Sequence, residues 1–303
     1  MPNQNENPTA YHSLLGLTSL TAAEFFHLLS HFHVLWQRYH AHHDLQGKRR
    51  RIEKFAEHGS MSLKGSANKL FFVLVYLKQH PLQSYHGFCF GMSQSKVSQW
   101  LKVLLPLLEQ SLAKIRQLPC REPSQLYVSL RLLTGQALWL DATERAIPRS
   151  LDEERQRYEY SGKKGFHTLK NLLVSEEHNR ILYLSPTVAG SIHDKAVADE
   201  MELKFLPEQS LLWDLAFMGY QPDGAKTLLP VKKSKQNKLL EQDKLYNRLL
   251  ASVRVRVEHV IAGVKRIRIV KDKIRLHGEQ IREVVMVIAC GLHNLRIDHR
   301  KLS

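Results

Sequence analysis

The chain has 303 residues, of which 43% are hydrophobic, so it is long enough to fold around one large core or two cores of ordinary size. Its 44 Lys and Arg outnumber its 29 Asp and Glu, which gives a formal net charge of +15, and its three cysteines are widely separated without a CxxC pair. These figures argue against a disulfide scaffold or a zinc-thiolate site, and they favour a polyanionic partner such as nucleic acid.

The hydropathy pattern argues against a membrane. The N-terminal segment is polar, and no apolar run reaches the roughly 18–20 residues that would span a bilayer. Most of the positive charge lies in residues 226–301, which hold 19 Lys and Arg against 7 Asp and Glu. We therefore expect a cytoplasmic protein that associates with the nucleoid and uses its C-terminal quarter to approach DNA.

The first third of the chain is predicted to be helical. Apolar residues recur at helical spacing over 19–45 and again over 69–80, where Pro81 ends the segment. After the glycine at position 91, Ser93 is a predicted N-cap for a helix with Val97, Trp100 and Leu104 on one face.

This order of helix, glycine turn and polar-headed helix is typical of a helix-turn-helix, which presents the first residues of its second helix to the major groove. The predicted base-reading residues are Gln94, Ser95, Lys96, Ser98 and Gln99. A purely structural helical turn would have the same pattern. We expect an N-terminal DNA-binding module over 1–118, with the helix-turn-helix at about 71–115, followed by a linker over 119–135.

From about residue 136 the pattern changes to short strands. QALWLDAT ends an apolar run at Asp141, and GFHTLKNLLVS and RILYLSPTVAG are two further strand candidates. A helix over 191–206, a strand LLWDLAF that ends at Asp214, a short strand TLLPVKK and a helix-rich tail follow. This order favours an α/β domain over 136–303 with a ribonuclease-H-like mixed sheet flanked by helices.

The segment VRVRVEHV has two readings. Its period-two alternation over 253–258 suggests a strand, whereas apolar residues recur at i, i+3, i+4 and i+7 over the longer window from Leu249 to Ile267. The helical match is about three times longer, so we predict a helix. It would bring Arg254, Glu258 and Lys265 onto one face.

Three carboxylates in this domain suggest metal chemistry. Asp141 and Asp214 are embedded in apolar sequence, where an uncompensated charge is costly to bury, and Glu258 lies on the predicted helix. If the fold brings the three together, they repel one another unless divalent cations compensate their charge. Mg²⁺ prefers oxygen ligands, and two ions about 3.5–4 Å apart can activate the attacking oxygen and stabilise the leaving oxygen in phosphoryl transfer.

Several segments together resemble insertion-sequence transposases of the DDE superfamily, in the branch related to Harbinger-type elements. The matching segments are LDATERAIPRS (140–150), YSGKKGFHTLKN (160–171), RILYLSPTVAGSIHDK (180–195), LLWDLAFMGY (211–220), VEHVIAGVKRIRIV (257–270) and ACGLHNLR (289–296). They occur in the order and spacing of that family, and the helix-turn-helix segment resembles its N-terminal module. The resemblance covers nearly the whole chain.

The resemblance implies an enzyme that cleaves double-stranded DNA at the terminal inverted repeats of its element and joins the 3′ ends to target DNA. It implies Asp141, Asp214 and Glu258 as the catalytic, metal-binding triad, with two Mg²⁺ or Mn²⁺ ions, and a homo-oligomer when DNA is bound. Asp194 in GSIHD is the alternative second acid, although its predicted position at a helix start also suits a capping role. We prefer Asp214.

Six basic residues near these segments are predicted to contact DNA phosphates, although a solvated surface would have the same composition. They are Lys163, Lys164, Lys170, Arg254, Lys265 and Arg266. Two other functions stay open: a catalytically silent DNA-binding protein that has kept the fold, and a stand-alone metal-dependent nuclease without specific binding to repeat ends.

Overall fold

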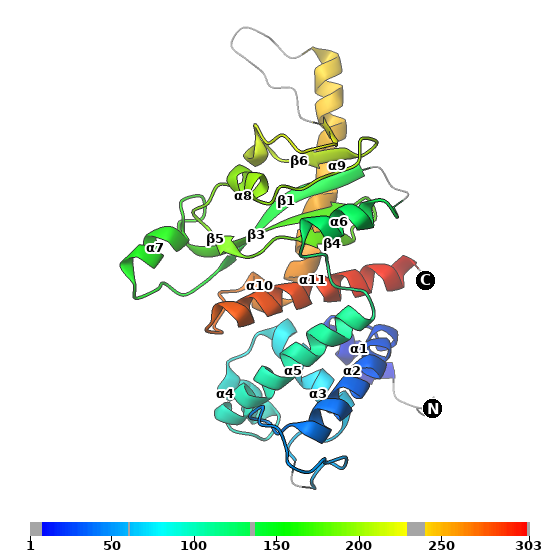
Figure 1. The fold of residues 1–303 in the computed structure, drawn as a ribbon, viewed down its shortest axis with the longest axis vertical. Helices are drawn as coiled ribbons and strands as arrows, with labels where there is room; N and C mark the ends of the chain where they lie inside the picture. Colours follow the sequence, from blue (N-terminus) through cyan, green and yellow to red (C-terminus); the bar gives the residue numbers. More distant parts are fainter. Residues whose placement is uncertain (1–7, 60, 134–136, 229–239, 302–303) are drawn as a thin grey trace. The chain divides into compact units, whose positions relative to one another are not determined.

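The structure is a computed structural model that describes residues 8–59, 61–133, 137–228 and 240–301. Within these residues the chain forms two compact units, a helical unit and an α/β unit. The helical unit comprises Met1–Leu118, Lys265–Asp272 and Leu276–Ser303, and the α/β unit comprises Pro119–Val264 and Lys273–Arg275. Figure 1 shows the elements of both units, which are described separately below.

The helical unit is built around α5. Its elements are α1 (Pro8–Thr18), α2 (Ala22–His42), α3 (Gly65–Gln79), α4 (Gln83–Cys89), α5 (Gln94–Lys114), α10 (Arg268–Lys271) and α11 (Glu279–Lys301). Helix α5 packs against α2, α4 and α11. Its Trp100 lies against Trp36 of α2 with ring centroids 5.7 Å apart, and both rings are fully buried. The predicted helices over 19–45, 69–80 and from 94 are confirmed as α2, α3 and α5.

Local caps explain where two of these helices begin. Ser93 accepts a hydrogen bond from the Lys96 backbone at 3.3 Å, which confirms the predicted N-cap of α5. Thr21 and Glu24 form a reciprocal capping box at the start of α2, with the Glu24 carboxylate accepting from the Thr21 backbone N–H at 2.7 Å. The α2 helix therefore begins at Ala22 rather than at the predicted residue 19.

The α/β unit contains a mixed sheet of seven strands in the described part of the chain. Its strands are β1 (Ala137–Ala146), β2 (Tyr160–Ser161), β3 (Phe166–Glu176), β4 (Ile181–Leu184), β5 (Val188–Ala189), β6 (Ser210–Trp213) and β7 (Lys226–Leu228). The main path runs β2-β3-β1-β6-β7, and β4 and β5 also pair with β3. Strand β1 is antiparallel to β3 and parallel to β6, and β6 is parallel to β7. This topology confirms the ribonuclease-H-like fold class.

Helices cover both faces of the sheet. Residues of α6 (Pro123–Leu130) and α8 (Asp194–Glu200) share a buried core with Leu138, Leu140 and Leu172 on one face. On the other face, Trp139 and Leu212 pack with Leu250 and Ile261 of α9 (Glu241–Lys265). Figure 1 shows α9 in gold, running behind the strands. Because side chains alternate along a strand, β1 serves both layers with successive residues.

Three elements differ from the expectation in extent. Strand β1 continues five residues beyond Asp141, because Glu144 and Arg145 find cross-strand positions opposite Lys170 and Leu169 of β3. The single strand expected over 180–190 is two short strands, since Pro186 lies between them and has no N–H to donate. Helix α8 spans only Asp194–Glu200 of the expected 191–206. The end of the expected strand TLLPVKK lies outside the described residues.

The compact units also divide the chain differently from the expected domains. The expected linker contains α6, whose Leu126 and Leu130 are buried in the core of the α/β unit. Residues 276–303, expected in the catalytic domain, belong to the helical unit, where Asn294 donates to the Gln117 carbonyl at 2.9 Å. The segment VRVRVEHV is helical, as predicted, and forms part of α9.

Candidate functional site

Two of the predicted catalytic acids occupy corresponding positions on adjacent strands. The parallel register of β1 and β6 pairs Leu138 with Leu211, Trp139 with Leu212 and Leu140 with Trp213. Asp141 is the next residue of β1, Asp214 directly follows the last residue of β6, and both are half-buried. Because neighbouring strands lie about 4.8 Å apart, this register brings the two acids close together.

The alternation of β1 assigns Asp141 to one face of the sheet. Trp139, two residues before it, packs with Leu250 and Ile261 of α9, so Asp141 lies on the face that α9 covers. Asp214 stands in the same relation to Leu212, which belongs to the same cluster. Its backbone carbonyl accepts from the Phe217 N–H at 3.0 Å, which begins the short 3₁₀ turn η1 (Leu215–Phe217) directly after the strand.

The third predicted acid lies on the helix that covers this face. Glu258 is exposed on α9, one turn before Ile261, which contacts the sheet. Among the residues that the structure describes, no three His, Cys, Asp or Glu side chains gather closely enough to hold a metal ion. The fold thus brings Asp141 and Asp214 together and leaves Glu258 on α9, outside such a group.

The alternative acid, Asp194, belongs to the opposite face. It opens α8, whose Val197 and Ala198 share the core with Leu138 and Leu140. Its carboxylate forms an ion pair of 2.7 Å with Lys170 Nζ, and the two side chains are 13% and 5% exposed. The N-cap of α8 is His193, which makes no side-chain capping bond, and Asp194 is the acidic residue of the first turn.

Lys170 is held inside the protein. Besides Asp194, its ammonium donates to the Ile192 carbonyl at 2.6 Å and lies 3.9 Å from Glu144 Oε1. Because Lys170 is only 4% exposed, its charge is compensated internally rather than presented to solvent. These contacts give it a structural role where the sequence predicted a phosphate contact.

A buried arginine on the sheet was missed by the sequence analysis. Arg145 lies four residues after Asp141 on the same face of β1 and is 1% exposed. Its guanidinium donates to Asn171 Oδ1 at 2.7 Å and to Thr187 Oγ1 at 2.9 Å. The alternation of β1, had the strand been predicted to its full length, would have placed this cation on the face of Asp141.

The helix-turn-helix consists of α4, the turn at 90–93 and α5. The turn contains Gly91 with φ of +64°, a conformation that favours glycine. Gln94 and Ser95 are exposed at the start of α5, whereas Lys96, Ser98 and Gln99 are half-buried. Gln94 Nε2 donates to Gln83 Oε1 of α4 at 2.6 Å, so the two helices share a polar contact at this end.

The remaining predicted phosphate contacts are spread over the chain. Lys163 and Lys164 are exposed in the loop between β2 and β3, and Arg266 is exposed in the helical unit. Lys265 is half-buried at the end of α9. Arg254 lies on α9, but its side chain is outside the described part of the structure.

Across the described chain, no helix has the length and apolar character needed to cross a bilayer.

Comparison with known proteins matches both units. The family model described as "DDE superfamily endonuclease" matches residues 140–294, which include Asp141, Asp214 and Glu258, and the model described as "Helix-turn-helix of DDE superfamily endonuclease" matches residues 62–114. The chain is 27% identical over 212 residues to the "Probable transposase for insertion sequence element IS702" of Microchaete diplosiphon, which covers 69% of this chain and 72% of that protein. No solved structure matches the chain.

Proposed function

This chain belongs to the DDE superfamily endonucleases and is a transposase of the insertion-sequence type, and on that premise we propose that it binds the ends of its own element, cleaves them and joins them to target DNA. The assignment to the Harbinger-related branch stays a prediction. The observation that carries the proposal is the parallel pairing of Leu140 with Trp213, since the acids Asp141 and Asp214 follow these two residues directly.

The residues present suit the divalent cations that this family uses. Two carboxylates on one face of adjacent strands repel each other, and a hard cation with oxygen ligands relieves that repulsion. Asp141, Asp214 and Glu258 would hold the ions, for which we propose two Mg²⁺ or Mn²⁺. Bound there, the ions supply Lewis-acid activation of the attacking oxygen and stabilisation of the leaving oxygen.

The chemistry consists of two displacements at phosphorus without a covalent protein–DNA intermediate. In the first, water attacks a phosphodiester at the element end, the P–O3′ bond breaks, and a free 3′-hydroxyl and a 5′-phosphate result. In the second, that 3′-hydroxyl attacks a phosphodiester of the target DNA, forms a new P–O bond and displaces a target 3′-oxygen. Both steps need the DNA held in line with the acids, which is a matter of positioning.

We propose that residues outside the triad hold the DNA in position. The exposed start of α5, with Gln94 and Ser95, would read base edges of the terminal repeat in the major groove. Lys163, Lys164 and Arg266, which are exposed, would contact phosphates, together with Lys265 and Arg254 on α9. Since two element ends must meet, we propose a homo-oligomer on DNA. A DNA partner also implies that the protein associates with the nucleoid.

A cleavage assay with two duplexes tests this function. The protein is incubated with Mg²⁺, a target plasmid and an end-labelled duplex that carries the terminal repeat, or a duplex of shuffled sequence. We expect nicked 3′ ends and joined products from the repeat duplex only. Binding without cleavage would instead indicate a silent DNA-binding protein, and equal cleavage of both duplexes would indicate a stand-alone nuclease.

A further inference from the structure

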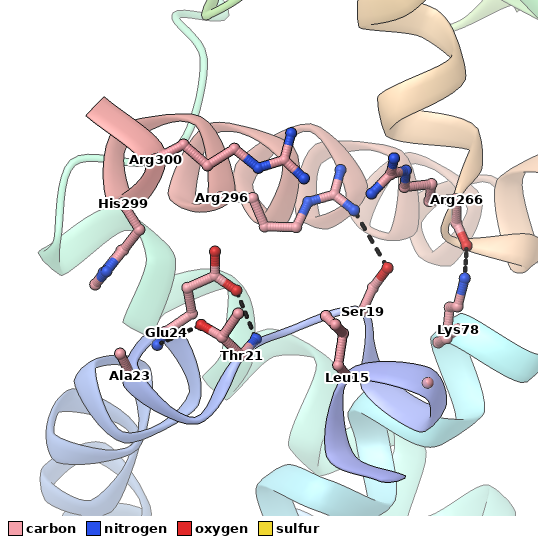
Figure 2. Close-up of a pocket in the computed structure, with 11 residues that line it drawn as sticks. Leu15, Ser19, Thr21, Ala23, Glu24, Lys78, Arg266, Arg296, His299 and Arg300 are labelled. Atoms are coloured by element: carbon pink, nitrogen blue, oxygen red, sulfur yellow. Dashed lines mark hydrogen bonds between the residues drawn. The ribbon is translucent and has the colours of Figure 1, made fainter. Parts of the chain in front are cut away.

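A cavity of about 430 Å³ lies within the helical unit, between the ends of several helices. Figure 2 shows that Arg296 and Arg300 of α11 and Arg266 near α10 reach toward it, with Lys78 of α3 and the start of α2 along its border. These residues come from distant parts of the sequence, so no local sequence motif predicts the cavity.

The cavity carries an excess of positive charge. Among the described residues that line the cavity, one carboxylate, that of Glu24, accompanies the cations Lys78, Arg266, Arg296 and Arg300. This carboxylate already accepts the Thr21 backbone N–H at 2.7 Å in the capping box of α2. His299, which also lines the cavity, is within 3.0 Å of His27 Nδ1 and adds no negative charge. The cavity is therefore about three positive charges out of balance.

Two of the cations are held in place by the protein. Arg296 is 5% exposed, and its Nη1 donates to Ser19 Oγ at 3.2 Å. Lys78 Nζ donates to the Arg266 carbonyl at 2.9 Å. Burial, and then the nearby Arg266 and Arg300, lower the pKa of Arg296 to about 10, and burial followed by Arg296 and Arg266 also lowers the pKa of Lys78. The lowered pKa values show that the cations of the cavity repel one another.

An anion with several acceptor oxygens would resolve this repulsion. Guanidinium groups present paired N–H donors in a fork that matches phosphate oxygens, and such charge-assisted hydrogen bonds are stronger than neutral ones. The first turn of α2, which borders the cavity at Thr21, Ala23 and Glu24, adds the positive end of a 21-residue helix. We propose that this cavity of the helical unit binds a phosphate group, either one of the DNA backbone or one of a free phosphate compound.

The proposal does not depend on the cleavage chemistry, and full-length protein tests it with inorganic phosphate as the probe. Arg266→Gln/Arg300→Gln removes two exposed guanidinium groups from the cavity, so the variant is expected to fold. Arg38→Gln is the matched control, because it removes an exposed arginine from α2 of the same unit, outside the cavity. Thermal unfolding is measured in phosphate and in chloride at equal ionic strength.

We expect phosphate to raise the Tm of the wild type and of Arg38→Gln by about 3–6 °C at concentrations some tenfold above the Kd, and to leave the double variant unchanged. An equal shift in all three proteins, or no shift in the wild type, would overturn the proposal. The source of the phosphate follows from duplex binding at several salt concentrations. Arg300→Gln alone is used for this comparison, because Arg266 is already proposed to contact a DNA phosphate. If the phosphate belongs to DNA, Arg300→Gln loses about 0.9 from the slope of log K against log salt, and if it belongs to a free phosphate compound, the slope equals that of Arg38→Gln.

Discussion

Leu140 of β1 is paired with Trp213 of β6 in parallel register, and each is followed directly by an aspartate. Although the two aspartates are far apart in the sequence, this pairing brings them within about the distance between neighbouring strands, roughly 4.8 Å. The even-numbered residues of β1 pack toward α8 and Trp139 packs toward α9, so the same register also decides which acid can share a face with Asp141. Asp214 follows β6 two residues after Leu212, which packs with Trp139, whereas Asp194 opens α8 on the opposite face.

The start of α5 predicts a sequence-specific loss of binding. Gln94 is exposed there, so Gln94→Ala should lower affinity for the terminal-repeat duplex by about 5- to 150-fold, the range for one lost base contact, and leave the shuffled duplex nearly unchanged. Lys114→Ala, at the exposed far end of the same helix, is the control. Fluorescence anisotropy with both duplexes measures the ratio. An equal loss on both duplexes would show that Gln94 reads no base.

The turn of the helix-turn-helix depends on a close approach at Gly87. A Cβ at this position would lie 2.4 Å from the Met92 carbonyl oxygen, which is a backbone atom and cannot rotate away. Gly87→Ala should therefore destabilise the helical unit by about 1–3 kcal/mol and weaken duplex binding. Gly59→Ala serves as the control, because its Cβ would meet nothing within 4 Å. Thermal melts give the comparison, and equal Tm values for the two variants would contradict it.

His86 predicts an acid-sensitive stability of the same unit. Its ring is 1% exposed, packs on Phe72 at 4.4 Å and donates through Nε2 to the Phe72 carbonyl at 3.2 Å. Burial lowers the pKa of His86 to about 4 from the ordinary 6.5. The unfolded chain therefore binds a proton that the folded chain rejects, so the contribution is present above pH 6.5 and is lost as the pH falls toward 4.

The expected size is about 2 kcal/mol between pH 7.5 and pH 5, from 1.36 kcal/mol per pH unit. Urea unfolding of the wild type and of His86→Phe at both pH values isolates it, because His27 and His40, whose pKa values burial also lowers, are present in both proteins. The variant should lose less stability on acidification by that amount. Identical losses would show that His86 does not titrate as described.

How far the sequence predicted this fold depended on how local the determining interactions are. The N-cap at Ser93 and the helical period through Val257 and Ile261 act within a few residues, and both predictions were confirmed. The prediction ended strand β1 at Asp141, because charged residues such as Glu144 and Arg145 do not by themselves indicate a strand. Their partners on β3 become known only from the structure. Asn294 donates to the Gln117 carbonyl, and the Gln117 amide donates to Asp298. These residues are far apart in sequence, so the grouping of α11 with the N-terminal helices was not predictable from spacing.

The candidate site was also predictable from the sequence only where local features determine it. The sequence supplied Asp141, Asp214 and Glu258, and the preference for Asp214 over Asp194 rested on the family resemblance and on the predicted position of Asp194 at a helix start. The burial of Lys170 against Asp194 could not be read from the sequence, because a lysine near a glycine-rich turn has the same pattern whether it faces DNA or an internal carboxylate. That distinction depends on cross-strand register.

The pair of Lys170 and Asp194 predicts a stability effect. Asp194→Asn leaves a lysine that is 4% exposed, and within the described part of the chain its one remaining counter-charge is Glu144 Oε1 at 3.9 Å. We expect a loss of about 3 kcal/mol, the low end for a broken buried pair. Asp199→Asn on the same helix breaks an exposed pair with Lys195 and should change stability by less than about 1 kcal/mol. Urea unfolding compares the two, and equal losses would rule out a buried structural pair.

The central claim is that Asp141, Asp214 and Glu258 carry out the cleavage. The most direct test measures the single-turnover cleavage rate on an end-labelled terminal-repeat duplex with Mg²⁺. The rate is expressed per folded, duplex-bound molecule. The variants are Asp141→Asn, Asp214→Asn, Glu258→Gln and Asp194→Asn. We expect the cleavage rates of the first three variants to fall by about 100-fold or more, because even a 1 Å displacement of a catalytic group has that effect. Asp194→Asn should cleave at a rate near that of the wild type. Wild-type cleavage by Asp214→Asn, or a loss in Asp194→Asn as large as in Asp141→Asn, would contradict it.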